Sequence, residues 1–322
     1  MRILPLLLIL FLSVPAAAEP VALKAEPVPL DAENPMRTRV DGLRFLAGFS
    51  LSSPDRRFGG LSALRFGEDR GQLIAVTDDG HWVVLSARHD LAGVLVAVDG
   101  GEIGPLLGLN GAPMPREAEW RDSESLARRP KGGWYVGFER RHRIRGYGGA
   151  GFALPGRPHD VPVPRALYHA PFNEGLETLV TLADGRLLAV SERLIRPDGL
   201  TAGWLFDGRA WAEIGFVVDG PYRPTDATLL PGGDLLFVER RYNPITGLGA
   251  LIRRVPREQL VPGGTMRPQT VARLEAPVLV DNYEGIAARP APGGGALVYI
   301  VSDDNFRHQQ RTLLLQFLMD GR

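Results

Sequence analysis

Short apolar runs of strand length recur along the chain from about Leu43 onward. Clusters of glycine, aspartate or proline bound most of these runs, as is typical of strands joined by tight turns. No window sustains a 3.6-residue apolar period beyond two or three turns. The clearest runs are residues 72–77, 134–138, 186–191, 235–238 and 296–302. The pattern therefore predicts an all-β fold.

These runs belong to a repeated frame of two strands joined by a glycine-containing turn. The first strand of each copy carries a small or acidic residue, at Ser62, Glu124, Glu177, Asp226 and Glu284. The second strand ends in an acid, at Asp78 and Asp79, Glu139, Glu192, Glu239, and Asp303 and Asp304. The intervals from the first position to the second are 16, 15, 15, 13 and 19 residues, and the copies start 62, 53, 49 and 58 residues apart. Such a period, with room for two more strands per unit, is typical of β-propeller blades.

Five copies of the frame are visible, and the interval between Val98 and Arg121 is long enough to hide a sixth. A propeller ring closes when the last blade is completed by a strand from the start of the chain, which removes both open sheet edges. Residues 43–49 and 311–317 have the pattern needed to pair in this way. We therefore expect a single propeller domain of five or six blades over residues 43–322, closed by pairing of its N- and C-terminal strands. The proline-rich residues 19–42 are expected to form an extended arm before it.

The first 18 residues have the pattern of a secretory signal peptide. A positive charge at Arg2 precedes an apolar run from Ile3 to Val14, and small residues follow up to Ala18. The run of about 12 residues is too short to cross ~30 Å of hydrocarbon as a helix. No later stretch reaches 18 consecutive apolar residues. We expect cleavage near Ala18 and a periplasmic or secreted protein without a membrane span.

Composition narrows the chemistry. The chain of 322 residues has 37 basic and 37 acidic side chains, and this balance argues against a general binder of nucleic acid or anionic membranes. It contains no cysteine, which excludes disulfides, thiolate catalysis and cysteine-ligated zinc. A chain of this length, 44% apolar, can bury a large core without such cross-links.

The repeated acids predict a cation site. The innermost strand of each propeller blade lines the central channel, so acids at matching strand ends should gather at one mouth of it. Carboxylates placed together raise one another's pKa or require a cation. Because the frame offers only oxygen ligands, calcium or magnesium is favoured over zinc, and calcium suits an exported protein. The candidate metal ligands are Glu124, Glu139, Glu177, Glu192, Asp226, Glu239, Glu284 and Asp304.

An arginine follows the acid in three copies, at Arg140, Arg193 and Arg240. Guanidinium groups bind phosphate through two parallel hydrogen bonds, so these arginines are candidates to hold a small anionic or phosphorylated ligand. The alternative interpretation is a structural ring of ion pairs between blades. His142 and His308 follow strand-end acids by three to five residues, and either is a candidate general acid or base. Their alternative is a solvated loop position.

Eight short motifs follow one another along the chain: Gly60-Leu-Ser-Ala-Leu64, Val76-Thr-Asp-Asp-Gly80, Asp122-Ser-Glu-Ser-Leu126, Gly137-Phe-Glu-Arg140, Glu174-Gly-Leu-Glu-Thr-Leu179, Val190-Ser-Glu-Arg193, Asn282-Tyr-Glu-Gly285 and Val301-Ser-Asp-Asp-Asn-Phe306. Taken in order and spacing, these motifs resemble the bacterial family described as esterase-like activity of phytase. The resemblance covers residues 43–318 and implies a β-propeller that hydrolyses phosphoesters or other esters.

Two functional hypotheses follow. The first is a calcium-dependent hydrolase of phosphorylated or other esters, acting at the channel mouth. The second is a non-catalytic ligand-binding or scaffold propeller whose acids pair with arginines. The fold itself supports either. Carboxylate oxygens that converge within about 5 Å without arginine partners would favour a metal, whereas one arginine per carboxylate would favour the scaffold.

Overall fold

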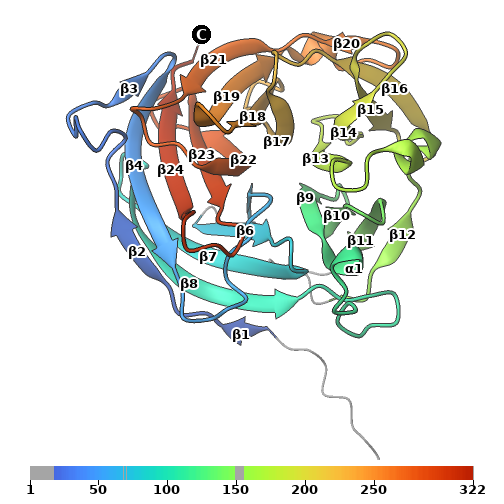
Figure 1. Ribbon diagram of the computed structural model, residues 1–322, viewed down its shortest axis with the longest axis horizontal. Coiled ribbons are helices and arrows are strands. Elements are labelled where there is room, and N and C mark those ends of the chain that lie inside the picture. The colour runs from blue at the N-terminus through green and yellow to red at the C-terminus, as the bar shows by residue number, and fades with distance from the viewer. Residues whose placement is uncertain (1–17, 68, 70, 149–155, 322) are drawn as a thin grey trace, which may run out of the picture.

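Five β-sheets stand around a central axis like the blades of a propeller (Figure 1). The structure, a computed structural model, describes residues 18–67, 69, 71–148 and 156–321, so nearly all of the predicted signal peptide lies outside it. Helical structure among these residues is limited to α1 (Ala118–Arg121) and two 3₁₀ turns, η1 (Arg165–His169) and η2 (Arg257–Gln259). None of these helices is long and apolar enough to cross a membrane. The all-β propeller prediction is confirmed.

Blades 1 and 2 come from the first half of the chain. From the centre outward, blade 1 contains β5 (Arg65–Phe66), β6 (Gln72–Val76), β7 (His81–His89), β8 (Leu95–Pro105) and β1 (Glu19–Pro20). Blade 2 contains β9 (Ser123–Arg128), β10 (Trp134–Phe138), β11 (Arg143–Tyr147) and β12 (His159–Val161). The interval between Val98 and Arg121 holds the end of β8, a loop and α1. The described residues therefore form five blades, and the sixth blade considered for this interval is absent there.

Blades 3 and 4 follow the same meander. Blade 3 contains β13 (Leu176–Thr181), β14 (Leu187–Ile195), β15 (Thr201–Phe206), β16 (Trp211–Phe216) and β20 (Thr265–Met266). Blade 4 contains β17 (Arg223–Leu229), β18 (Leu235–Asn243), β19 (Gly247–Val255) and β21 (Gln269–Leu274). The two-residue β20 leaves blade 4 to pair in parallel with β16, which links neighbouring blades at their outer edges.

Blade 5 joins the two ends of the chain. It contains β22 (Asn282–Pro290), β23 (Ala296–Asp303), β24 (Thr312–Met319), β4 (Leu43–Ser52) and β2 (Lys24–Pro27), and β3 (Arg39–Val40) also pairs with β4. Strands β24 and β4 run antiparallel, with Leu314 opposite Phe49, so the predicted ring closure is confirmed. The arm over residues 19–42 supplies β1 and β2, which cover the outer edges of blades 1 and 5.

The core lies between blades. One cluster joins Trp82 of blade 1 to Leu126 and Phe138 of blade 2, and another packs the rings of Phe216 and Phe237, from blades 3 and 4, 4.8 Å apart. Each such large side chain contributes roughly 1.5–3 kcal/mol through burial. This packing leaves the innermost strands β9, β13, β17 and β22 in contact around the axis, where their polar ends form the candidate site.

Candidate functional site

A bulge in the inner strand of each of four blades re-aims one side chain. In blade 3, Leu176 pairs with Ser191 and Thr178 with Val190, so Glu177 lies outside the regular pairing. The same register shift falls on Glu124 in blade 2 and on Glu284 in blade 5. Bulges of this kind commonly direct a side chain toward a functional site. In blade 4 the bulged residue is Thr225.

A second equivalent position lies at the end of the next strand. The backbone N–H groups of Asp78, Glu139 and Glu192 donate to the carbonyls of Gly60, Asp122 and Gly175, at 2.9–3.0 Å. The pairing of β22 with β23 and of β17 with β18 puts two further residues at this position. The five equivalent residues are Asp78, Glu139, Glu192, Arg240 and Asp303.

The repeated frame therefore selected the wrong residue in both strands of blade 4. The equivalent positions are Thr225 and Arg240, each one residue away from the predicted acid. Neighbouring residues on a strand point to opposite faces, so Asp226 and Glu239 turn away from the mouth. Both are fully buried. Asp226 pairs with Arg65 at 2.7 Å, and Glu239 pairs with Arg253 at 3.0 Å. These two predicted metal ligands are instead partners in structural ion pairs.

Asp304 also has a structural role. Its Oδ1 accepts hydrogen bonds from the backbone N–H groups of Gly60 and Phe306, both at 3.0 Å, and its Oδ2 accepts one from Thr312 at 2.9 Å. Its neighbour Asp303, which is buried, occupies the equivalent position at the mouth. The placement of Asp304 as the blade 5 ligand is thus corrected to Asp303.

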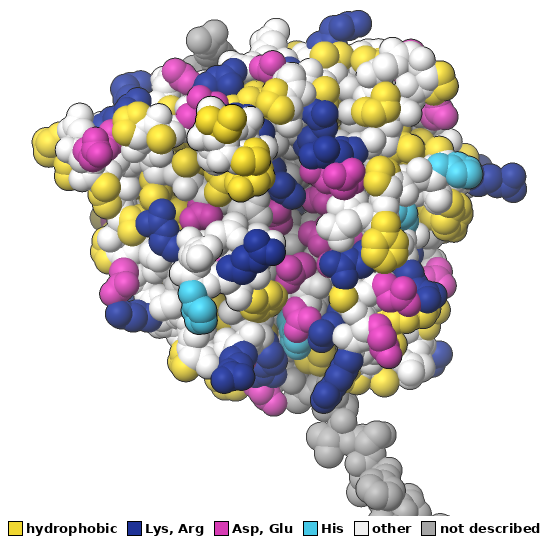
Figure 2. All heavy atoms as spheres, in the orientation of Figure 1, with side chains coloured by type: hydrophobic (Ala, Val, Ile, Leu, Met, Phe, Trp, Pro, Cys, Tyr) yellow, Lys and Arg dark blue, Asp and Glu magenta, His cyan; other side chains and the backbone are white. Residues whose placement is uncertain are grey.

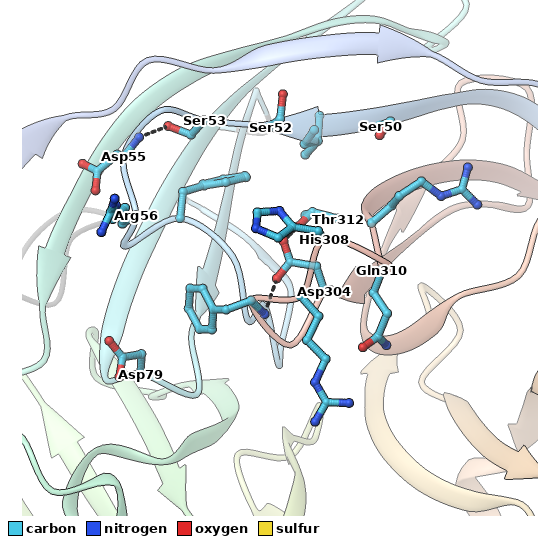
Figure 3. Close-up of a pocket in the computed structure, with 15 residues that line it drawn as sticks. Ser50, Ser52, Ser53, Asp55, Arg56, Asp79, Asp304, His308, Gln310 and Thr312 are labelled. Carbon is cyan, nitrogen blue, oxygen red and sulfur yellow. Dashed lines mark hydrogen bonds between the residues drawn. The ribbon is translucent and has the colours of Figure 1, made fainter.

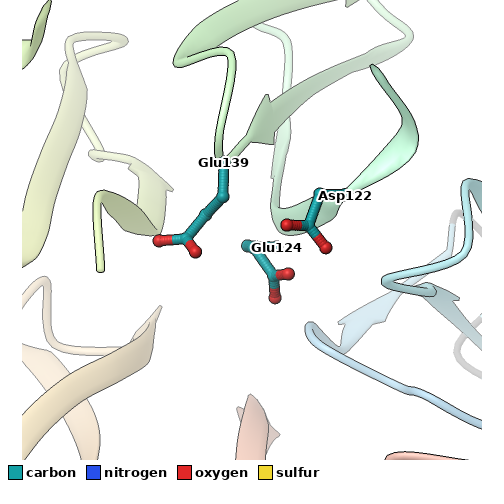
Figure 4. A group of neighbouring side chains, drawn as sticks. All are labelled: Asp122, Glu124 and Glu139. Atoms are coloured by element: carbon teal, nitrogen blue, oxygen red, sulfur yellow. The ribbon is translucent and has the colours of Figure 1, made fainter. Parts of the chain in front are cut away.

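Three carboxylates meet closely at the mouth. Asp122, Glu124 and Glu139 each offer one oxygen within 4.8 Å of the other two, and all three side chains are buried (Figure 4). The carboxyl group of Glu177 contacts that of Glu139. Acidic side chains surround the hollow at the centre of this face (Figure 2). We call the full set the acidic ring: Asp78, Asp122, Glu124, Glu139, Glu177, Glu192, Glu284 and Asp303.

The acidic ring is short of positive charge. Arg140 Nε lies 2.6 Å from Asp122 Oδ2, and Arg240 Nε lies 3.0 Å from Glu284 Oε1. Arg193 Nε lies 3.2 Å from Glu174 and 3.8 Å from Glu192. The three predicted substrate-binding arginines therefore each face a carboxylate. Among the described residues, no arginine or lysine forms an ion pair with Asp78, Glu124, Glu139 or Glu177.

The pKa values of the acids without an arginine partner are raised. Burial, together with neighbouring carboxylates, raises the pKa of Asp78 and of Glu139 to about 8. Burial raises the pKa of Glu124 and of Glu177 well above the usual range, and the charge of Glu139 acts on both in the same direction. Carboxylates in this condition either hold protons at neutral pH or bind a cation.

A glycine makes room for Asp78. Gly60 has a φ of +57°, and a Cβ atom added to it would lie 2.1 Å from Asp78 Oδ1. Any larger residue would therefore displace this carboxylate. Asp78 Oδ1 is itself buried without a hydrogen-bond partner in the described structure, which leaves it available to a ligand.

The two predicted catalytic histidines lie outside the acidic ring. His142 is half-buried against Gly175, with Nε2 3.1 Å from the Pro171 carbonyl, and burial lowers its pKa. His308 is exposed on the loop between β23 and β24 (Figure 3). Within the described residues, neither imidazole hydrogen-bonds to a carboxylate of the ring.

The donor set fits a divalent cation. Every atom of the acidic ring that could coordinate a metal is a carboxylate oxygen, which suits Ca²⁺ or Mg²⁺. Glu124 is 8% exposed and Glu177 is 5% exposed, and each has another carboxyl group as its polar neighbour. Asp122, Glu124 and Glu139 are the residues that would hold the ion.

Sequence reasoning left Asp78, Asp122 and Asp303 out of the proposed ligands. Asp78 and Asp303 each belong to a pair of adjacent aspartates in the repeated frame, and only the register identifies which member faces the mouth. Asp122 lies where blades 1 and 3 have Gly60 and Gly175, so the repeat alone gives no reason to expect an acid there.

Comparison with known families assigns the chain to one of them. The model of the Phytase-like family, described as esterase-like activity of phytase, matches residues 56–306, and the chain belongs to this family. No curated protein matches the sequence.

Solved structures with a similar fold include three proteins of different named activity. A gluconolactonase from Xanthomonas campestris is 11% identical with a TM-score of 0.45, and the match covers 95% of this chain and 99% of that one. A virginiamycin B lyase from Staphylococcus aureus is 10% identical with a TM-score of 0.40, covering 92% and 99%. An endo-arabinase from Bacteroides thetaiotaomicron is 9% identical with a TM-score of 0.45, covering 80% and 94%.

Proposed function

We propose that this protein is an exported, calcium-dependent hydrolase of phosphorylated or other esters, acting at the mouth of the propeller channel. One observation carries the proposal: the convergence of Asp122, Glu124 and Glu139 within 4.8 Å, with one arginine beside Asp122. The family description supports an ester as the substrate. The signal-peptide pattern over residues 1–18 supports export.

The residues of the ring supply the remaining chemistry. A bound cation would polarise the ester and lower the pKa of an attacking water. Glu139 would hold the ion as a carboxylate. Glu177 contacts Glu139, and burial raises the pKa of Glu177 well above the usual range, so Glu177 can hold a proton and donate it to a leaving oxygen. Arg140 and Arg240 hold Asp122 and Glu284 in place through their ion pairs.

A substrate panel tests this proposal. The mature chain is assayed with aryl phosphates and aryl carboxylic esters, first with chelator and then with added Ca²⁺. We expect hydrolysis of at least one ester class only when Ca²⁺ is present. Glu124→Gln removes one charge from the ring and should abolish the activity, whereas Glu258→Gln, at a position 70% exposed on η2, should retain it.

Two results would overturn the proposal. One is the absence of Ca²⁺-dependent turnover on every ester, and the other is full activity of Glu124→Gln. The alternative of a non-catalytic scaffold is favoured by the Arg65–Asp226 pair, which joins blades 1 and 4 as that hypothesis requires. The Arg253–Glu239 pair lies within blade 4. The two pairs account for two of the predicted acids and leave the acidic ring unexplained.

A further inference from the structure

A second feature adjoins the acidic ring. A pocket of about 800 Å³ lies between residues 50–58 and the loop that joins β23 to β24 (Figure 3). Its wall includes Asp79 and Asp304. These residues directly follow Asp78 and Asp303 of the ring in the sequence, so the pocket is adjacent to the channel mouth.

The arginines of this pocket are largely free. Arg56 and Arg307 line it and are exposed, and within the described structure neither guanidinium pairs with a carboxylate. Arg311 also lines it, 49% exposed, with its Nε 3.7 Å from Asp281. Three guanidinium groups from two separate segments therefore border one cavity.

Two of the three acids that line the pocket pair with nearby arginines. Asp55 pairs with Arg57 at 2.7 Å, and Asp79 pairs with Arg121 at 2.8 Å. Asp304 accepts three hydrogen bonds from neutral donors, so among the described residues its formal charge has no arginine partner. In the same part of the chain the unpaired Arg56 and Arg307 outnumber this one acid, and the net charge of the lining is therefore positive, opposite in sign to that of the acidic ring beside it.

The loop that carries Arg307 and His308 is held in a defined shape. The Arg307 N–H donates to the Asp304 carbonyl at 2.8 Å, and Asp304 fixes the loop to Gly60 and Thr312. Asn305 and Phe306 have φ values of +48° and +50°. This left-handed backbone is costly for residues with side chains, and such conformations persist where surrounding contacts enforce them. Arg307 is therefore presented from a fixed loop.

We propose that this pocket binds a doubly charged oxyanion group, phosphate or sulfate, of a small ligand. Guanidinium groups present paired donors that match the oxygens of such anions. Three guanidinium groups offer more hydrogen-bond donors than the two oxygens of one carboxylate can use, which favours an anion of higher charge. The acidic ring would repel such an anion from the channel itself. The inference rests on the proposed function in one respect: the anionic end of an ester substrate would occupy this pocket while its ester group faces the acidic ring.

Calorimetric titration of the mature chain tests the pocket without requiring turnover. The probes are inorganic phosphate, sulfate and acetate, with chelator present so that no cation carries the anion. We expect phosphate and sulfate to bind and acetate to bind much more weakly. The double variant Arg56→Gln/Arg307→Gln should weaken phosphate binding by about tenfold or more. Arg209→Gln, at an exposed turn outside the pocket, is the matched control and should bind as the parent does.

Each contrary outcome has a distinct meaning. Failure of the parent chain to bind phosphate, or equal binding by the double variant, would overturn the pocket. Loss of phosphate binding in Glu124→Gln would also overturn it, because binding would then depend on the ring. Absence of ester hydrolysis together with normal phosphate binding would overturn the proposed function and leave the pocket standing.

Discussion

Arg65 and Asp226 form a buried bidentate ion pair that joins blade 1 to blade 4, with both Nη–Oδ distances at 2.7 Å. The same guanidinium donates to the carbonyl of Leu179 in blade 3 at 2.7 Å and to that of Ile286 in blade 5 at 3.0 Å. One side chain from the short strand β5 therefore connects the inner strands of three other blades.

Breaking this pair should destabilise the whole propeller. Asp226→Asn leaves the Arg65 charge buried without its counter-charge, and a loss of about 3–5 kcal/mol in the free energy of unfolding is expected. Urea denaturation measures it. Glu26→Gln breaks the exposed Lys24–Glu26 pair and should change the same quantity by less than about 1 kcal/mol. Equal stability of the two variants would contradict the role given to Arg65.

Calcium should stabilise the protein through the acidic ring. A hundredfold excess over Kd contributes about 2.7 kcal/mol, which for a domain of this size raises Tm by several degrees. Thermal melting with Ca²⁺ and with chelator measures this shift. Glu124→Gln should reduce the shift. Glu239→Gln should lower Tm in both conditions, because it weakens the Arg253 pair, yet keep the shift. A shift that disappears only in Glu239→Gln would contradict the register described for blade 4.

Without a cation, stability should fall as the pH rises from 7 to about 8.5. The pKa of Asp78 and of Glu139 is raised by burial to about 8, so the folded state binds protons that the unfolded chain has released above pH ~4.5. Stability therefore decreases while the folded state keeps these protons, and the decrease levels off as the groups ionise above pH ~8. Urea midpoints in chelator should show the decrease, and Glu139→Gln should reduce it. A midpoint that is constant over this range would argue against the shared burial of these acids.

The mature protein should begin near Glu19. The apolar run and the small residues before it predict cleavage after about Ala18, so protein recovered outside the cytoplasm should lack the first 18 residues. N-terminal sequencing, or intact-mass measurement, of protein from its native cell checks this. Soluble native protein that still carries Met1 would contradict export by this route.

Much of the fold follows from local patterns, whereas the site depends on register. Strand runs, glycine turns and the complementary terminal segments predict the propeller and its closure, because these are periodic or paired features. The inward residues of blade 4 were missed because Thr225 and Arg240 are not acids, and each lies next to an acid, Asp226 or Glu239, that the repeated frame selects instead. A signal was present: the interval from Asp226 to Glu239 is 13 residues, whereas that from Thr225 to Arg240 is 15, matching blades 2 and 3.

The grouping of the pocket arginines could not be predicted from the sequence either. Arg56 and Arg307 are far apart along the chain and belong to no repeated motif. They line one cavity because ring closure pairs β4, which precedes Arg56, with β24, which follows Arg307. Closure by the chain ends thus creates a cavity that neither end forms alone.

Arg240 makes the distribution of charge around the channel mouth asymmetric. It occupies in blade 4 the position that an acid occupies in the other four blades, and it forms an ion pair with Glu284. A ring of five equivalent acids would offer a cation five equivalent binding positions. Here the three carboxylates that converge belong to blade 2, whereas the charge of Arg240 acts on Glu284 of blade 5 and on Glu192 and Glu177 of blade 3. One substitution in a repeated unit therefore converts a nearly symmetric ring into a polarised one, in which a bound ion has a preferred place and a ligand attached to it a preferred orientation.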